Sequence, residues 1–389
     1  MGSNVEQQQR RWAVKRFLEG ESPDAICASL GRSRAWLYKW VERYLEEEPS
    51  WFISQSRRPH SHSLHTPTEI EEIVKITRLN LYNRGLFCGD QAICWELEEM
   101  GVNPVPSLRT ISRILDRHGL TNRRTGHYEP KGKLYPVLPA LIPNQTHQAD
   151  FVGPRHLKGP YRFYSLNAVD LMTGRCAVQP LQSRKGQSIL DGFWAIWMRL
   201  GMPENIQVDN DVSFFGSPMH PRGMGPLIRL CLHHKVQLWF IPPAEPWRNG
   251  VVEKFNDHYQ QKFLNKVMMT AENELKEASF GFEYKHNSSY RYSKLRGKTP
   301  LQALVGANRT LKFPDQNQTP QHPLKKPRTG RYHVVRYIRS DNRLNIFGEF
   351  FPVSSELQYE YVVATIDVKE QKLKLFLANK QVDEFNYKS

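Results

Sequence analysis

Apolar residues recur with a helical period of about 3.6 in three short segments at the start of the chain. The pattern predicts helices at 10–19, 24–30 and 33–44. In the third helix the apolar face carries Leu37, Trp40, Val41 and Tyr44. Ser33 is a suitable N-cap residue, and Gly31 lies in the short turn before it. Helix, short turn and helix is typical of a helix-turn-helix, although a plain three-helix bundle with a basic solvated face shows the same periodicity.

A second set of helical segments follows and predicts a second helix-turn-helix. The expected helices are 68–82, 90–100 and 107–117, and Ser107 is a suitable N-cap residue for the last of them. The inner face of this last helix would carry Leu108, Ile111, Ile114 and Leu115. As recognition helices, the two third helices would turn Arg34, Tyr38, Lys39, Arg109, Arg113 and Arg117 toward DNA. A helical spacer domain is the alternative for the second set.

The periodicity changes to short strands and helices from about residue 144. Strands are expected at 148–152, 163–169, 175–181, 205–209 and 236–241, with helices at 188–200 and 250–266. This alternation predicts a mixed α/β core. Four more strands, at 334–338, 345–352, 361–367 and 372–377, suit a small C-terminal β-barrel of the SH3-like kind.

These patterns divide the chain into seven segments. The helix-turn-helix domains are 1–50 and 67–125, the α/β core is 143–308, and the C-terminal β-barrel is 329–389. The linkers are 51–66, 126–142 and 309–328. The first linker carries Arg57 and Arg58, and the last one is basic. The fold class is therefore multidomain, with two all-α domains, an α/β domain and a small β-domain.

Charge points to a polyanionic partner. The 54 Lys and Arg against 39 Asp and Glu leave a net charge of +15. Residues 285–328 hold ten basic residues and one acid, which is +9 of that total, and tyrosines are interleaved among them. Phosphate contacts and base stacking need this combination, so nucleic acid is the expected partner. The apolar runs are too short for a membrane span, and five scattered cysteines suit a reduced, cytoplasmic protein.

Three acids stand at positions where an α/β protein builds its sites. Asp150 lies in the first predicted strand, Asp209 ends the fourth, and Glu253 lies in the first turn of the long helix. Carboxylates gathered from distant segments repel one another unless they share divalent cations, and few oxygen ligands suit Mg²⁺. The alternative is ordinary turn and surface chemistry, since acids are common at both kinds of position.

The sequence motifs around these acids resemble those of a known family. The motifs are HQADFVGP, VDND followed by Phe214 and Phe215, and IPPAEPWRNGVVEKFN, with SRRPH at 56–60, SLRTISRILDRHGL at 107–120 and YRYSKLRGKTPLQAL at 290–304. In this order they resemble bacterial insertion-sequence transposases of the DDE type, which belong to the retroviral-integrase superfamily. The resemblance covers nearly the whole chain.

The resemblance implies a ribonuclease H-like catalytic core in which Asp150, Asp209 and Glu253 bind two Mg²⁺ ions, with Mn²⁺ as a substitute. Such an enzyme cleaves the ends of its mobile element and joins the 3′-OH ends to target DNA. Further DNA contacts are then expected from Arg57, Arg58, Arg248, Asn249, Lys254, Arg296 and Lys298. The implied partners are double-stranded DNA and further copies of the chain assembled on it, in the bacterial cytoplasm at the nucleoid. The need for an accessory protein is left open.

The chain departs from the family pattern in two places. Asp211 stands where the family usually has glycine, so a neighbouring acid competes with Asp209 for the metal. The interval to Glu253 is also longer, because of the Gly- and Pro-rich stretch at 216–226. Two other functions stay open. One is a domesticated helix-turn-helix regulator without catalysis, and the other is a ribonuclease H-like nuclease that cuts without joining.

Overall fold

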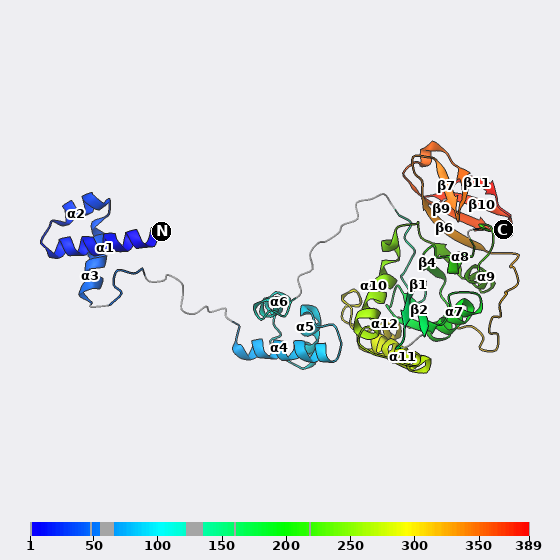
Figure 1. Ribbon diagram of the computed structural model, residues 1–389, viewed down its shortest axis with the longest axis horizontal. Coiled ribbons are helices and arrows are strands. Elements are labelled where there is room, and N and C mark those ends of the chain that lie inside the picture. Colours follow the sequence, from blue (N-terminus) through cyan, green and yellow to red (C-terminus); the bar gives the residue numbers. More distant parts are fainter. Residues whose placement is uncertain are drawn as a thin grey trace. The chain divides into compact units, whose positions relative to one another are not determined.

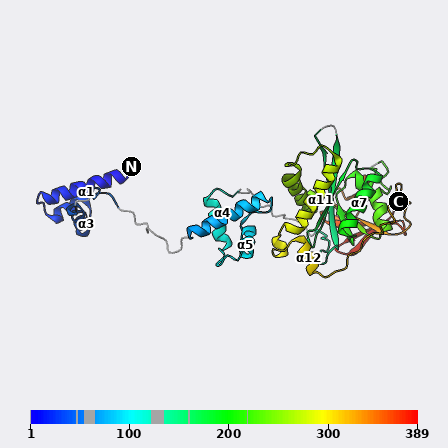
Figure 2. The ribbon, with the colours of Figure 1, turned by 90° about the horizontal axis from the view of Figure 1, so that it is seen from below.

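A computed structural model of the chain describes residues 2–46, 49–54, 66–121, 135–158, 161–217 and 219–388 (Figures 1 and 2). The chain forms two compact units, Met1–Pro67 and Thr68–Ser389. The expected contacts of Arg57 and Arg58 fall outside the described residues. The division into seven segments remains a prediction.

The first unit holds three helices around a small core. They are α1 (Gly2–Leu18), α2 (Pro23–Leu30) and α3 (Arg34–Leu45). The Ser33 hydroxyl accepts a hydrogen bond from the Trp36 amide at 3.2 Å, and Gly31 ends α2 with a left-handed φ of 62°. The core consists of Ala13, Val14, Ile26, Cys27, Leu37, Trp40 and Val41. The three predicted helices are confirmed, although α1 begins at Gly2, eight residues before the expected start, and the predicted apolar face is confirmed except at Tyr44, which is exposed.

The second helical region is α4 (Thr68–Asn83), α5 (Asp90–Glu99) and α6 (Leu108–Arg117). Ser107 caps α6 as predicted, with its hydroxyl accepting from the Thr110 amide at 3.2 Å. The buried face of α6 is Ile111, Ile114 and Leu115, whereas Leu108 is exposed in the first turn. The core of this region also includes Tyr290, which comes from a segment 170 residues further along the chain.

The α/β core is built on a mixed sheet. Its strands are β1 (Thr146–His156), β2 (Arg162–Asp170), β3 (Cys176–Leu181), β4 (Asn205–Val208) and β5 (Gln237–Phe240). The first three strands pair antiparallel, while β1, β4 and β5 run parallel. Every predicted strand is present within about two residues at most ends, so the mixed α/β class is confirmed.

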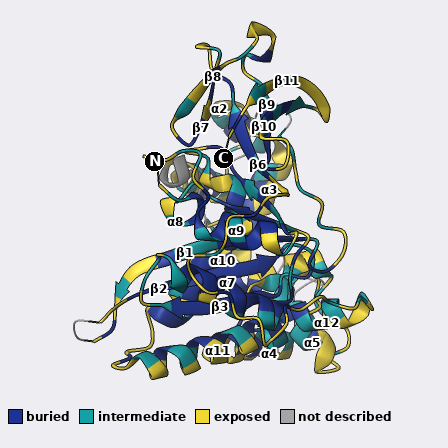
Figure 3. Ribbon diagram, turned by 90° about the vertical axis from the view of Figure 1, so that its right-hand side faces the viewer, coloured by how far each residue is buried: buried dark blue, intermediate teal, exposed yellow. Residues whose placement is uncertain are grey.

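Helices cover both faces of this sheet. One face packs against α7 (Gln187–Leu200), α8 (Val212–Phe215) and α9 (Pro226–His233). The other packs against α10 (Gly250–Tyr259) and α11 (Glu272–Ser289). Figure 3 shows the buried residues concentrated in the sheet and α7. The Gly- and Pro-rich stretch enters α9 at Gly225, whose missing side chain lets Phe214 and Phe215 lie close: a Cβ there would stand 2.7 Å from the Phe215 carbonyl carbon.

The C-terminal strands continue the core sheet. They are β6 (Arg331–Tyr337), β7 (Arg343–Ile346), β8 (Glu349–Pro352), β9 (Tyr361–Asp367), β10 (Lys372–Leu377) and β11 (Lys380–Asn386). The sheet order is β11-β10-β9-β6-β5-β4-β1-β2-β3, with β7 and β8 forming a separate hairpin. The predicted strands at 334–338, 361–367 and 372–377 are confirmed, whereas the single strand expected at 345–352 is the hairpin of β7 and β8, which turns at Phe347 and Gly348, and β11 is one more strand that the pattern missed.

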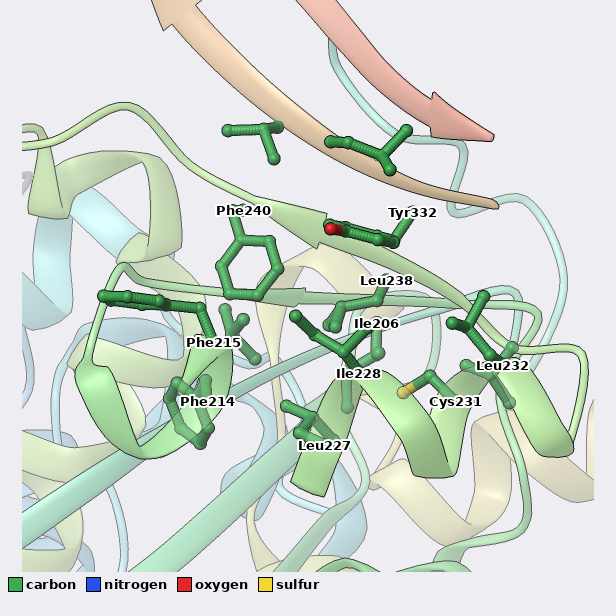
Figure 4. Packing of buried hydrophobic residues seen from close by; sticks show 14 of the residues in the cluster. Ile206, Phe214, Phe215, Leu227, Ile228, Cys231, Leu232, Leu238, Phe240 and Tyr332 are labelled. Atoms are coloured by element: carbon green, nitrogen blue, oxygen red, sulfur yellow. The ribbon is translucent and has the colours of Figure 1, made fainter. Parts of the chain in front are cut away.

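The junction between the two parts of the sheet is a parallel pairing of β5 with β6. Leu238, Trp239 and Phe240 stand opposite Tyr332, His333 and Val334. Tyr332 is buried beside Leu238 and Phe240, above the apolar side chains of α9 (Figure 4). This burial explains why β6 pairs with the core instead of closing a separate barrel.

The remaining elements connect these layers. They are η1 (Pro246–Asn249), the π-helical turn η2 (Gln260–Leu264), η3 (Ser293–Leu295), α12 (Pro300–Gly306) and η4 (Ser355–Leu357). The expected linker 309–328 lies along the core, where Leu324 joins the hydrophobic cluster and the Lys312 carbonyl accepts from the Met202 amide. No helix of the described residues is both long and apolar enough to cross a membrane.

Candidate active site

Asp150 and Asp209 occupy matching positions on neighbouring parallel strands. Gln148 of β1 stands opposite Gln207 of β4, and each aspartate lies two residues further on. Side chains two residues apart in a strand share a face of the sheet. The two aspartates therefore lie on one side of the sheet, Asp150 within β1 and Asp209 directly after the carboxyl end of β4, where sites form in α/β sheets.

The two glutamines hold the turn that leads into the helix of Glu253. Both amide groups donate to the Arg248 carbonyl, at 3.2 Å from Gln148 and 2.8 Å from Gln207. The Gln148 side-chain oxygen accepts from the Val251 and Val252 amides, which lie in the otherwise unpaired first turn of α10. Asn249 is buried and donates to the Ala149 carbonyl at 3.1 Å. Strands β1 and β4 thus fix the start of α10, and Glu253 lies in its first turn.

The three carboxylates affect one another's charge. Burial, followed by the negative charges of Asp209 and Glu253, raises the pKa of the Asp150 carboxyl to about 7. The pKa of Glu253 is raised by partial burial and then by the charges of Asp257 and Asp209. Burial also raises the pKa of Asp209, although the Asp211 amide and Arg184 act in the other direction. The negative charges of Asp209 and Glu253 therefore act on Asp150, and that of Asp209 acts on Glu253.

A chain of buried polar groups orients Asp150. Asn256, one turn after Glu253, donates from its Nδ2 to the Asp150 Oδ2 at 2.9 Å. Asn167, which stands opposite Asp150 on β2, donates to the Asn256 Oδ1 at 2.8 Å, and the Ser165 hydroxyl donates to the Asn167 Oδ1 at 2.7 Å. All three supporting side chains are buried. This network, together with a hydrogen bond from the Phe151 backbone, fixes the orientation of the Asp150 carboxylate.

Asp211 has a structural role beside the site. Its Oδ1 caps α8 by accepting from the Ser213 amide at 2.8 Å, and its Oδ2 accepts from Arg184 Nη1 at 2.6 Å. Its own amide donates to the Asp209 Oδ1 at 3.1 Å. Since both of its carboxylate oxygens are engaged, the arrangement favours Asp209 over Asp211 as the metal ligand.

The donor set suits a hard divalent cation. Asp150, Asp209 and Glu253 offer carboxylate oxygens, which Mg²⁺ prefers, and their mutual repulsion would be relieved by bound positive charge. Within the described residues, no three Asp, Glu, His or Cys side chains are gathered closely enough to hold a metal ion as they stand. The carboxylates would therefore have to draw together around a cation.

The expected DNA contacts on the recognition helices lie at the surface. Tyr38 and Lys39 are exposed on α3, and Arg109 and Arg113 are exposed on α6. Arg34 is exposed but forms an ion pair with Asp24 of α2. Arg117 likewise pairs with Glu71 of α4. The outward placement agrees with the periodicity, and two of the six charges or hydroxyls already have partners.

The expected contacts near the core fall into two groups. Lys254, Arg296 and Lys298 are exposed. Arg248 instead pairs with Glu245 at 2.9 Å and lies over the Tyr135 ring at 4.0 Å, and Asn249 supports the backbone of β1. The structure therefore gives Arg248 and Asn249 internal partners where the sequence predicted DNA contacts.

Several basic residues of the stretch 285–328 also have partners within the chain. Arg291 pairs with Glu99 at 2.6 Å, and Arg309 pairs with Glu204 at 2.8 Å. Lys285 donates to the Arg84 carbonyl and Lys294 to the Leu171 carbonyl. Fewer than the ten counted charges are thus open to phosphates.

A basic hollow borders the loop of Asp209 and Asp211. Its volume is about 670 Å³, and its lining includes Arg162, Arg184, Lys185 and His322 with Val212 and Ser213 of α8. Arg184 links the hollow to the site through its ion pair with Asp211. Positive charge beside a carboxylate cluster suits a phosphodiester that must approach those acids.

Several of these site residues carry weak signals in the sequence. The triplets Gln148-Ala-Asp150 and Gln207-Val-Asp209 repeat one pattern at the ends of two predicted strands. Asn256 lies three residues after Glu253, on the same side of the helix. Arg184 has no comparable signal, because only the folded chain brings it to Asp211.

Comparison with known proteins gives matches in both units. Residues 4–50 match the model of the homeodomain-like domain. Unit two is similar to the HTLV-2 integrase catalytic core domain solved in complex with magnesium in a trimeric form: 19% identity, 42% of this chain, 99% of that chain and a TM-score of 0.34. A chain of the simian T-cell lymphotropic virus intasome, solved with PP2A regulatory subunit B56 gamma, is similar at 17% identity over 74% of this chain and 88% of that chain, with a TM-score of 0.37.

Proposed function

We propose that this chain is a DNA transposase of the DDE type. It would bind the ends of its mobile element, cleave them by metal-dependent phosphodiester hydrolysis and join the 3′-OH ends to target DNA. The observation that carries the proposal is the placement of Asp150 and Asp209 on one side of two neighbouring parallel strands, with Glu253 in the first turn of the helix that these strands hold. Perturbed carboxylates are frequent at functional sites, and metal-dependent nucleases need such carboxylates to bind their cations.

Each of these residues has a defined support. Asn256 orients Asp150, the Asp211 amide holds an oxygen of Asp209, and Gln148 with Gln207 fixes the helix of Glu253. When bound by these acids, two Mg²⁺ ions would activate a water or a 3′-OH and stabilise the leaving oxygen. The protein's own contribution is to hold the carboxylates within reach of one phosphate, beside the basic hollow.

The helical regions provide the means to choose a DNA sequence. The homeodomain-like match at residues 4–50 supports a DNA-binding role for α1–α3. The exposed side chains of Tyr38, Lys39, Arg109 and Arg113 would then contact grooves and phosphates. Arg34 and Arg117 would need to exchange their carboxylate partners for DNA. Lys254, Arg296 and Lys298 would add phosphate contacts near the core.

We further propose that active copies assemble on DNA as at least a dimer. Paired joining requires two ends to be held together, and one carboxylate cluster serves one scissile phosphate at a time. Positive charge would keep free copies apart and phosphates would neutralise it, so DNA should promote assembly and salt should oppose it. Mass measurement with end DNA at low and high salt tests this, and a monomeric complex that still joins paired ends would refute it.

The first experiment uses the DNA that flanks the gene, searched for matching inverted repeats and offered as substrate with Mg²⁺ or Mn²⁺. Asp150→Asn, Asp209→Asn and Glu253→Gln should each abolish cleavage while DNA binding persists, since an amide cannot supply the charge. Asp191→Asn, at an exposed acid of α7, is the matched control and should cleave normally. Asp211→Asn should retain cleavage, because the Asp211 carboxylate is engaged in capping and pairing.

The outcomes separate the proposal from its two alternatives. Cleavage without joining would indicate a nuclease, and specific binding without cleavage would indicate a regulator. Cleavage that persists in chelator contradicts the metal role. An active Asp209→Asn protein beside an inactive Asp211→Asn protein would move the second ligand by two residues.

A further inference from the structure

We propose that the C-terminal strands are part of the scaffold of the catalytic site, with Arg336 and Tyr361 as positioning residues. Arg336 of β6 would hold the loop of Asp209, and Tyr361 of β9 would hold the turn before the helix of Glu253. The inference rests on the proposed function for the meaning of the site, but its contacts are independent of it. A domain tethered only to bind DNA would need none of these contacts.

Arg336 is buried and directs its guanidinium at the loop that follows β4. Nη2 donates to the Asn210 Oδ1 at 2.9 Å, and Nη1 donates to the Ile241 carbonyl at 3.3 Å. The Asn210 Nδ2 donates to the same Ile241 carbonyl. Asn210 stands between Asp209 and Asp211, so the middle residue of the acidic loop is tied to the C-terminal strand.

The groups that accept from Arg336 are all uncharged. Besides Asn210 and Ile241, they are the Asn345 carbonyl at 2.7 Å and the Val335 carbonyl at 2.9 Å. Burial lowers the pKa of this guanidinium to about 9, because the charged form loses its hydration at this position. Removing this donor would take a hydrogen bond from the Asn345 carbonyl and from the Asn210 Oδ1, which is costly in a buried site. The contact is therefore geometrically demanding and unlike a solvated surface arginine.

Tyr361 makes a second link, to the turn before α10. Its hydroxyl lies 2.9 Å from both carboxylate oxygens of Glu245 and 3.0 Å from Arg248 Nη2. Arg248 Nε donates to Glu245 at 2.9 Å, and its guanidinium lies 5.0 Å from the centre of the Tyr361 ring. The carbonyl of Arg248 is the one that accepts from Gln148 and Gln207.

One residue therefore joins the catalytic strands to the C-terminal strands. The backbone of Arg248 is held by the two strands that bear Asp150 and Asp209, while its side chain is held by β9. With Arg336 on the loop of Asp209, the C-terminal part contacts the segments of two of the three carboxylates. The continuous pairing of β5 with β6 gives these contacts a rigid base.

The test uses the full-length chain and two readouts besides cleavage. One is hydrogen exchange of the loop 207–216 in metal-free protein, and the other is Mn²⁺ affinity measured by electron paramagnetic resonance. Arg336→Met should speed exchange of the loop and weaken Mn²⁺ binding by about tenfold each, as expected for loss of a buried charged hydrogen bond. Arg336→Lys should restore part of both, because it keeps a donor.

Two further variants cover the possibility that Arg336→Met fails to fold. Asn210→Ala removes the loop side of the contact and should reproduce both changes. Tyr361→Phe should speed exchange of the Val251 and Val252 amides by roughly threefold to tenfold, since it removes hydrogen bonds but keeps the ring. Leu375→Ala, at a fully buried position of β10, is the control for general destabilisation. It should lower the melting temperature without changing the loop or Mn²⁺ affinity.

The proposal is overturned if Asn210→Ala leaves loop exchange and Mn²⁺ affinity unchanged, or if Leu375→Ala changes both as strongly. A wild-type chain that binds no Mn²⁺, or an Asp209→Asn chain that still binds it fully, counts against the proposed function. Loop exchange in metal-free protein still decides the role of Arg336 in that case, so the two failures are distinguishable.

Discussion

The two helical regions share a sequence pattern but differ in what completes their cores. In α1–α3 the buried residues all come from within the first 41 positions, and the region stands in a compact unit of its own. In α4–α6 the core takes in Tyr290, whose hydroxyl donates to the Gly85 carbonyl at 2.6 Å. Phe87 stacks on His258 of α10 at 5.0 Å. Repeated periodicity therefore does not make two equally independent domains.

The difference bears on how each region can act. The first region forms a compact unit of its own, whereas the second is docked on α10 and α11 and moves together with the carboxylates. Residues 285–300 carry the docking surface and part of the basic stretch. If the proposed function holds, the second region is therefore the one that would set the distance between a recognised sequence and the cleaved bond.

The largest expected effect comes from Tyr290→Ala. The change removes a buried aromatic ring and leaves the Gly85 carbonyl without its donor, so we expect a loss of about 3–5 kcal/mol from the stability of the α4–α6 docking. Hydrogen exchange of α4–α6 should rise steeply, while α1–α3 stays unchanged. Tyr284→Ala, at an exposed position of the same segment, is the control and should have little effect. Equal protection of α4–α6 in both variants would contradict the shared core.

The second largest effect should come from acidification, which should destabilise α4–α6 but not α1–α3. Burial lowers the pKa of His258 to about 4 and that of His286 to about 3, against an ordinary value of 6.5. Both imidazoles are neutral when docked, so their contribution is complete above pH 6.5 and is lost as the pH falls toward those values. At pH 5 each of the two imidazoles should lower the stability of the docked region by roughly 2 kcal/mol. The first 59 residues contain no histidine, so α1–α3 should not respond.

Hydrogen exchange at pH 7 and pH 5, corrected for intrinsic rates, measures this effect. The groups around His258 are His286 and Lys262, both of which disfavour its protonation, and the Phe87 and Tyr290 rings. His286 also has the Tyr292 hydroxyl at 3.1 Å and the Gly174 carbonyl at 3.3 Å. His258→Phe should remove part of the pH dependence of α4–α6. An unchanged profile in that variant would assign the effect to other buried histidines.

A third test concerns the close approach of α5 to the turn after η3. Gly297 has a φ of +81°, and a Cβ there would stand 2.8 Å from the Trp95 ring. Gly297→Ala should therefore destabilise the docking by roughly 1–3 kcal/mol, through backbone strain and overpacking. Gly281→Ala is the matched control, because its Cβ would meet open space in a helix and should stabilise by up to about 1 kcal/mol. Thermal unfolding of both variants gives the comparison.

Periodicity predicted most of the elements but few of the contacts between them. Except for α1, which begins eight residues early, the helices of both regions and the strands β9 and β10 lie within about two residues of where the apolar pattern predicted them. β11 was missed because its residues alternate weakly and are mostly exposed. The three acids were predicted from their positions along the predicted strands and helix and from the family motifs around them. Arg336 was not, because nothing in a strand's own pattern tells which neighbour its side chain will meet.

The smallest expected effect compares the two N-caps directly. Ser33 and Ser107 each cap a predicted recognition helix, with their hydroxyls 3.2 Å from the amides of Trp36 and Thr110. Replacing either by alanine should cost about 1 kcal/mol, because one orphan amide of the first turn loses its acceptor.

The consequence should nevertheless differ between the regions. The buried core of α1–α3 comes entirely from its own helices, so Ser33→Ala should lower the stability of the whole first unit. In α4–α6 the docking at Tyr290 holds the region in place, so Ser107→Ala should speed exchange only in the first turn of α6. Ser33→Thr and Ser107→Thr keep a hydroxyl acceptor and should restore protection. If both alanine variants loosened their regions to the same extent, the docked region would be no more supported than the free one, and the comparison between them would fail.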